Sequence, residues 1–232
     1  MLWALTQPVS FLALAVAFCA ALLLRRFVHY GCSSPWKRRT GRSPIATTGP
    51  ATSGSVRTTA FDVHRDVDPY GVVAALVGGT GWGGAAQVRI RGGVGALLAG
   101  PAVIIAASQL MFAYYVLAGL GSTQLVLLAP SDVLRGMAGE PLQQFVLSVA
   151  VGLLAFGVVA LLPLPPLDGW GVTNRLIRKP GGSWQRARYW LEDRNIGALI
   201  LLIAVLIPLF SGRPLLLWLL DVLLTPVLRA WA

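Results

Sequence analysis

The sequence predicts an all-α integral membrane protein with five to six transmembrane helices. Of its 232 residues, 56% are hydrophobic and only 12% are charged, whereas soluble domains carry about a quarter charged residues. The mean hydropathy of +0.70 points the same way. Long apolar stretches approach the roughly 20 residues that a helix needs to cross a bilayer core. A soluble fold of this size would have no place to bury so much apolar surface.

The apolar stretches give the predicted elements in order. Spans are expected at 3–24, 95–120, 145–164, 196–210 and 215–228. Residues 70–80 are apolar but too short to span, so we expect a re-entrant segment or a short buried helix there. Residues 87–91 (QVRIR) alternate like a short strand. The remaining connections are expected to be a loop with an interfacial helix at 125–140, a basic loop at 173–194 and a tight turn at 211–214.

The net charge of +10 is interpreted as a topology signal and not as nucleic-acid binding, because the basic residues border the apolar runs. With the N-terminus outside and 70–80 re-entering, all 19 Lys and Arg residues except Arg135 and Arg213 fall on the cytoplasmic side. Arg25 and Arg26 follow the first apolar stretch and do not precede it. This order favours a retained first helix over a cleaved signal.

Four stretches, in chain order, resemble one family of membrane proteins. They are 61–71 (FDVHRDVDPYG), 81–88 (GWGGAAQV), 99–101 (AGP) and 161–169 (LLPLPPLDG). They are similar to the HIDPxG, GWAKPVPV, AGPxxN and NLLPIPPLDG segments of the site-2 proteases, which are intramembrane zinc metalloproteases. The last match is the most specific, since PxPPLDG at the end of a membrane helix is rarely seen by chance.

The resemblance implies a division of the chain and a zinc chemistry. The parts are a first transmembrane helix at 1–31, a basic flexible linker at 32–60, a site-2 protease-like core at 61–194 and a C-terminal transmembrane hairpin at 195–232. In that family two histidines of an HExxH motif and the aspartate of LDG hold zinc. Histidines four residues apart share one helical face, and the glutamate between them reaches the metal-bound water as general base.

This chain departs from the family in its first helix. It has only two histidines, His29 and His64, and no HExxH. With the family's downstream glycine as the anchor, the two ligand positions and the base position are replaced. They fall at Cys19, Leu23 and Ala20 respectively.

The other polar positions of the family site are replaced as well. The two asparagines fall at Ile104 and Ala160. Asp168 alone remains, as a vestigial metal ligand. We therefore expect no catalytic residues and no bound cofactor.

Several residues admit both a functional and a structural interpretation. Asp168 is either a remaining zinc ligand or a residue that caps a helix end or pairs with an arginine such as Arg175. Cys19 is either a soft metal ligand or nucleophile, or a small buried hydrophobe. An H-x-D-x-D cluster is either a metal site or a cap for the turn at 68–71; its members are His64, Asp66 and Asp68.

The proline break after the predicted span at 145–164 has two interpretations. It could accept an extended peptide by strand addition, as active relatives are thought to do, together with the strand-like segment. Otherwise it only keeps an ancestral backbone. The residues concerned are Pro163, Pro165, Pro166, Gln87 and Arg89.

These observations predict a catalytically inactive site-2 protease homologue (a pseudoprotease) of a bacterial cytoplasmic membrane. Its partners would be membrane lipids and another membrane protein, with a single-span protein as the first candidate. One alternative is an active intramembrane zinc metalloprotease with atypical ligands, drawn from Cys19, Asp168 and His64. The other is a membrane protein that holds a lipid or another apolar ligand in the emptied cavity. Only the protease alternative requires zinc.

Overall fold

The computed structural model describes residues 7–33, 67–84, 93–121, 125–137, 139–177, 181–210 and 212–232. The described chain is almost entirely helical, which confirms the all-α prediction. Most of the predicted linker lies outside these residues, as do the predicted strand at 87–91 and the side chains of His64 and Asp66.

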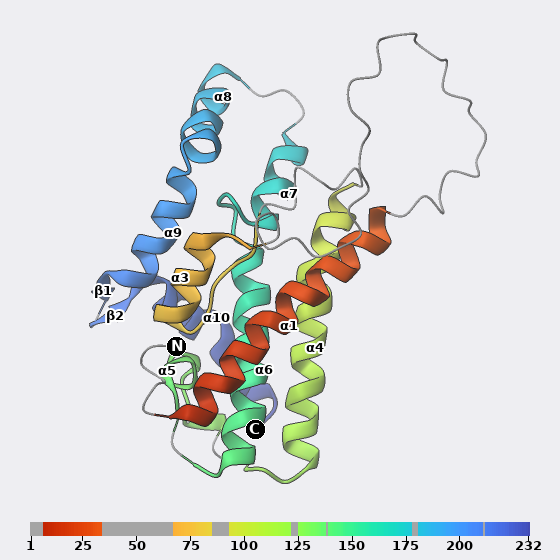
Figure 1. Ribbon diagram of the computed structural model, residues 1–232, viewed down its shortest axis with the longest axis vertical. Coiled ribbons are helices and arrows are strands. Elements are labelled where there is room, and N and C mark those ends of the chain that lie inside the picture. The colour runs from red at the N-terminus through yellow and green to blue at the C-terminus, as the bar shows by residue number, and fades with distance from the viewer. Residues whose placement is uncertain are drawn as a thin grey trace, which may run out of the picture.

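Among the described residues, three helices are long and apolar enough to cross a membrane. They are α1 (Pro8–Ser33), α4 (Val94–Leu117) and α6 (Pro141–Ala160). The most apolar window of α6 is 83% buried inside the protein, against 33% for α1 and α4. The central helix of the fold is therefore α6, and α1 and α4 lie beside it with outward apolar faces (Figure 1).

Small residues set the contact between α1 and α6. A Cβ atom on Gly152 would come within 2.9 Å of the Cβ of Ala17, so the two backbones approach closely there. Membrane helices commonly use such small residues because tight packing replaces the hydrophobic driving force that lipid removes. Phe18 and Phe156 pack edge to face on the same interface, with ring centroids 5.9 Å apart.

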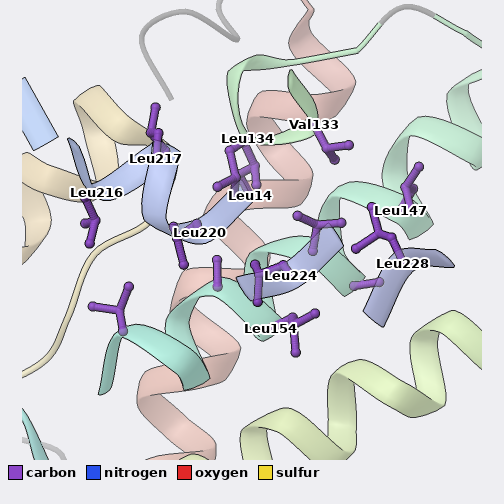
Figure 2. Packing of buried hydrophobic residues seen from close by; sticks show 14 of the residues in the cluster. Leu14, Val133, Leu134, Leu147, Leu154, Leu216, Leu217, Leu220, Leu224 and Leu228 are labelled. Carbon is purple, nitrogen blue, oxygen red and sulfur yellow. The ribbon is translucent and has the colours of Figure 1, made fainter. Parts of the chain in front are cut away.

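A leucine-rich helix, α10 (Leu215–Ala230), covers another side of α6. Its buried residues recur at helical spacing and belong to one cluster with Leu147 and Leu154 of α6. In Figure 2, Leu224 and Leu228 lie beside these two side chains. The residues of this stripe are Leu216, Leu217, Leu220, Leu224 and Leu228. At its end, Trp231 donates to the Oε1 of Gln109 at 2.8 Å and stacks on Phe112.

The path of α10 does not bring Arg229 to the end of the molecule where Arg25 lies, although the charge distribution predicted both on one side. Gln109 and Phe112 belong to the second half of α4, far from the helix start, so the chain ends away from Arg25 (Figure 1). The preceding helix, α9 (Ile196–Leu206), has 11 residues. A fourth to sixth span, including the C-terminal hairpin of spans, stays a prediction. The tight turn is confirmed as a hairpin of β1 (Pro208–Phe210) and β2 (Arg213–Pro214).

The apolar segment at 70–80 forms a short helix, α3 (Pro69–Gly78), which packs against α9. A Cβ atom on Gly78 would lie 2.6 Å from a methyl carbon of Val205, so glycine permits this contact. The prediction of a short helix is confirmed. Whether it crosses or re-enters the membrane stays a prediction.

A charged cluster holds α10 to α5 (Pro130–Arg135), the helix found within the predicted interfacial segment. Asp221 accepts from the backbone N–H and the hydroxyl of Ser131, each at 2.7 Å. Arg213 donates to the same carboxylate at 2.8 Å. Since Ser10 donates to the carbonyl of Met137 at 3.5 Å, this cluster lies at the end of the molecule where α1 begins.

The predicted basic loop at 173–194 is wrong, because most of it is helical. It contains most of α7 (Asp168–Leu176), all of α8 (Gly182–Arg188) and a π-helical turn, η4 (Tyr189–Asp193). Residues 183–194 hold no glycine or proline, and seven of the twelve favour helix: three Arg and one each of Gln, Ala, Leu and Glu. The charge of the segment did not indicate whether its backbone is helical or irregular.

Candidate functional site

The centre of the candidate site is a buried ion pair between α1 and α7. The Nε of Arg25 donates to Oδ2 of Asp168 at 2.9 Å, and Nη2 donates to Oδ1 at 2.6 Å. The third guanidinium nitrogen, Nη1, donates to the carbonyl oxygen of Gly84 at 2.9 Å. The three nitrogens of Arg25 thus connect α1 with α7 and with the segment that ends at Gly84, and these three segments are distant in the sequence.

The pair is removed from solvent by the surrounding protein. The side chain of Arg25 is 8% exposed and that of Asp168 is 0% exposed. Charges in such a place are tolerated only when they are paired and their hydrogen-bonding capacity is used. The two-point contact meets this condition, because the planar guanidinium matches both oxygens of the carboxylate.

The proline-rich break places Asp168 at this point. The backbone turns through 161–167 with short-range hydrogen bonds such as Leu167 N–H to the carbonyl of Leu164, and the peptide bond between Pro165 and Pro166 is cis. A new helix then begins, with Asp168 in its first turn, where the helix dipole favours a negative charge. Gly169 is required next to it, because a Cβ there would overlap the carbonyl oxygen of Leu161.

A compact turn unit brings Gly84 to Arg25. The unit comprises residues 67–71 and 81–84. Asp68 caps α3 by accepting from the N–H of Tyr70 at 3.0 Å and also accepts from the indole nitrogen of Trp82 at 2.9 Å. Val67 and Gly83 pair across the unit as an isolated bridge. The structural interpretation of Asp68, a cap for 68–71, is confirmed.

Asp68→Ala is expected to lower the free energy of unfolding by about 2 kcal/mol, since it removes a helix cap and leaves the buried Trp82 indole without its acceptor. Asp68→Asn keeps one acceptor oxygen and should lose roughly half as much. Denaturant titration of the purified protein measures both variants. Equal stability of wild type and Asp68→Ala would contradict the role of this carboxylate.

The start of α4 completes the surroundings of the pair. A Cβ atom on Gly100 would lie 2.8 Å from Nε2 of His29 and 3.4 Å from Cγ of Arg25. His29 follows Arg25 by one helical turn, so both side chains lie on the face of α1 that meets α4. Described parts of three of the four stretches therefore lie against Arg25 or His29 on one face of α1, and the fourth, 67–71, joins them through the bridge between Val67 and Gly83.

Comparisons of the chain with family models, with curated proteins and with solved structures gave no match. The interpretation of the site therefore rests on its own residues.

The structure does not bring the predicted positions in α1 to Asp168. Cys19 is exposed, and Leu23 is 50% exposed. Ala20 is half-buried, against the interface of α1 with α4 and α6. Asp168 faces Arg25, which lies six residues after Cys19, about 9 Å further along the helix. Packing against α4 and α7 decides which face of α1 turns inward, and that face carries Arg25.

The other predicted positions lie in packed protein. Ile104 is fully buried in a cluster with Ala21 and Phe156, so side chains occupy the space at this position. Ala160 is also buried, at the end of α6. Of the three prolines proposed for peptide binding, Pro163 is exposed, Pro165 is buried and Pro166 is half-buried. Their proposed strand partners, Gln87 and Arg89, lie outside the described residues.

Sequence reasoning missed Arg25 as the partner of Asp168. The prediction that Asp168 pairs with an arginine is correct in kind, but Arg175 instead donates to the carbonyl of Gly93 at 2.8 Å. One signal was available in the sequence. Arg25 and His29 stand four residues apart at the inner end of the first helix, which is the spacing of two side chains on one helical face.

Zinc does not fit the residues that surround Asp168. Both of its oxygens accept from Arg25, whose guanidinium has only donors and offers no lone pair to a metal. In the part of the chain that the structure describes, no three His, Cys, Asp or Glu side chains lie close enough to hold a metal ion. Three protein ligands are the usual minimum for catalytic zinc. No hydrolytic step through a metal is therefore derived for this site.

Proposed function

We propose that this chain is a non-catalytic relative of the site-2 proteases that resides in a bacterial cytoplasmic membrane and binds another membrane protein. The observation that carries the proposal is the buried pair of Arg25 and Asp168. Asp168 sits in the LDG setting where the family has a metal ligand, and a fixed cation of the protein itself neutralises it. The fold would then keep its shape without zinc.

The convergence of the four stretches supports the family part of this proposal. They are spread over more than 100 positions of the sequence, yet the described parts of three of them lie against Arg25 or His29 of α1, and the fourth pairs with one of these three. Chance likenesses would have no reason to meet in space. The order of the stretches along the chain is also that of the family.

The chemistry of the pair supports the non-catalytic part. Hydrolysis of a peptide bond needs an activated water and a group that takes its proton. An arginine guanidinium has only hydrogen-bond donors and no acceptor, so Arg25 cannot take the proton. Asp168 has both oxygens committed to Arg25, so it is not placed to act on a water.

The positions of basic residues support the proposed orientation, with the N-terminus outside and the Arg25 end in the cytoplasm. Arg25 and Arg175 lie at the end where α1 finishes and α4 begins. Arg135 and Arg213, the predicted exceptions, lie at the opposite end with α5 and the start of α1. Arg229 also lies away from the Arg25 end, because the chain finishes beside Gln109. Apart from Arg229, the asymmetry is the one that the positive-inside rule describes.

Metal analysis of the purified full-length chain tests the non-catalytic part. We expect zinc far below one ion per chain, with no difference between wild type and Asp168→Asn, which keeps the size of the side chain. Tagged single-span membrane proteins co-expressed with the chain should stay intact with both forms. Stoichiometric zinc in wild type that is lost in Asp168→Asn, or cleavage products that disappear in that variant, would overturn the proposal.

The binding part needs a separate measurement. At least one of the intact single-span proteins should co-purify with the wild-type chain in detergent and also with Asp168→Asn, because binding does not depend on a metal. If none of a broad panel is retained, the partner half of the proposal fails while the non-catalytic half stands.

A further inference from the structure

A helical arm at the Arg25 end of the molecule has a surface unlike the rest of the fold. The arm consists of α8 and η4, residues 182–193, and neither element has a buried residue. One aromatic contact ties it to the core, because Trp184 stacks on the buried Trp170 of α7 at 5.2 Å between ring centroids. It leads directly into the apolar helix α9 (Figure 1).

The arm combines exposed aromatic rings with arginines. Tyr189 is 46% exposed and Trp190 is 49% exposed, so each ring presents about half of its surface outward. The guanidinium carbon of Arg194 lies 5.7 Å from the centroids of both rings. Arg188 is paired with Glu192 on the same helix. Arg186 is exposed as well, in the last turn of α8.

The location of the arm matches the boundary between lipid tails and water. Asp168, Arg175 and the end of α1 lie at the same end of the three candidate spans. Tyr and Trp concentrate at this level of membrane proteins, because their rings are apolar while their polar groups remain hydrated. If the arm were surrounded only by water, this preference would not explain its two half-exposed rings.

We infer that the arm lies at the headgroup level of the membrane and binds the phosphate groups of anionic phospholipids through Arg186 and Arg194. Arginine suits this ligand, because its planar fork donates two hydrogen bonds to one phosphate. The rings of Tyr189 and Trp190 would enter the upper acyl region beside the bound headgroup and hold Arg194 in place. Anionic lipid on the cytoplasmic leaflet attracts basic segments of this kind. This inference goes beyond the proposed function and rests on the membrane location and orientation proposed there.

Hydrogen exchange of the full-length chain in lipid nanodiscs tests the inference. Backbone amides of residues 182–194 are compared in discs of phosphatidylcholine alone and in discs that also contain phosphatidylglycerol. We expect exchange to slow by about fivefold or more in the anionic discs. The attraction of one arginine to an anionic membrane surface corresponds to a factor of about this size. Arg186→Gln combined with Arg194→Gln should abolish the difference. Arg229→Gln, in the last turn of α10, is the matched control and should keep it.

The other outcomes overturn the inference. Equal exchange in the two kinds of disc would exclude a preference for anionic lipid. An equal slowing by inorganic phosphate in phosphatidylcholine discs would indicate a site for free phosphate and not for a headgroup. Slowing that survives in the double variant, or that disappears in Arg229→Gln, would mean that the two arginines do not carry the effect.

Discussion

Arg25→Ala is expected to lower the free energy of unfolding by about 3–5 kcal/mol. The substitution leaves the fully buried Asp168 without the cation that both of its oxygens contact. A buried charge that loses its partner keeps the whole cost of its desolvation. Reversible unfolding of the purified chain in detergent, followed by circular dichroism, measures the change.

A paired substitution separates the lost charge from lost packing. Arg25→Met together with Asp168→Leu removes both charges and should recover most of the stability, because apolar residues of similar volume often replace a buried ion pair without loss. Arg229→Ala, on an outward position near the chain end, should change stability by no more than about 0.5 kcal/mol. Wild-type stability in Arg25→Ala would contradict the role of the pair, and so would a double variant as unstable as Arg25→Ala alone.

Arg25→His combined with Arg26→Glu is expected to convert the chain into one that binds roughly one zinc ion. The first helix would then have an imidazole at position 25, a carboxylate at 26 and the existing His29, which is the spacing of a zinc-binding helix. The new imidazole is shorter than the arginine side chain. A zinc ion bound to it at about 2.0–2.1 Å would fill the space between the imidazole and Asp168. Elemental analysis of the purified variant measures the bound zinc.

The control for the metal gain is the same variant with Asp168→Asn added, which should bind zinc much more weakly because one ligand is lost. Wild type serves as the baseline. A double variant that is folded by circular dichroism yet binds no zinc would show that Arg25 and His29 do not occupy metal-binding geometry. It would leave the stability prediction for Arg25→Ala unaffected, so the two results are independent.

The long helices could be predicted from the sequence because their signal is local. Each of the stretches at 3–24, 95–120 and 145–164 overlaps a helix of the structure, since apolar length alone identifies such segments. The segment at 173–194 was mispredicted as a loop because its charge was weighed above its helix-forming residues. The end point of α10 was mispredicted too, since the contact of Trp231 with Gln109 is a long-range one.

Only part of the candidate site could be predicted from local sequence patterns. The LDG motif identified Asp168, and the turn signal at 68–71 identified Asp68 as a cap. The partner of Asp168 could not be chosen from the sequence, because it depends on which face of α1 turns toward α7. Cys19 and Arg25 are six residues apart, so they face directions about 120° apart on the helix. Cys19 is exposed, whereas Arg25 is buried.

The separation of Arg25 and Asp168 by 143 positions also has a consequence for biosynthesis. At about 5–20 residues per second, the ribosome adds the acidic partner roughly 7–30 s after the arginine. During that interval the first helix carries an uncompensated positive charge near its inner end. Its long side chain can extend toward the lipid headgroups until Asp168 is made. In the membrane arrangement proposed above, the first helix would therefore reach its final position only after Asp168 has been made.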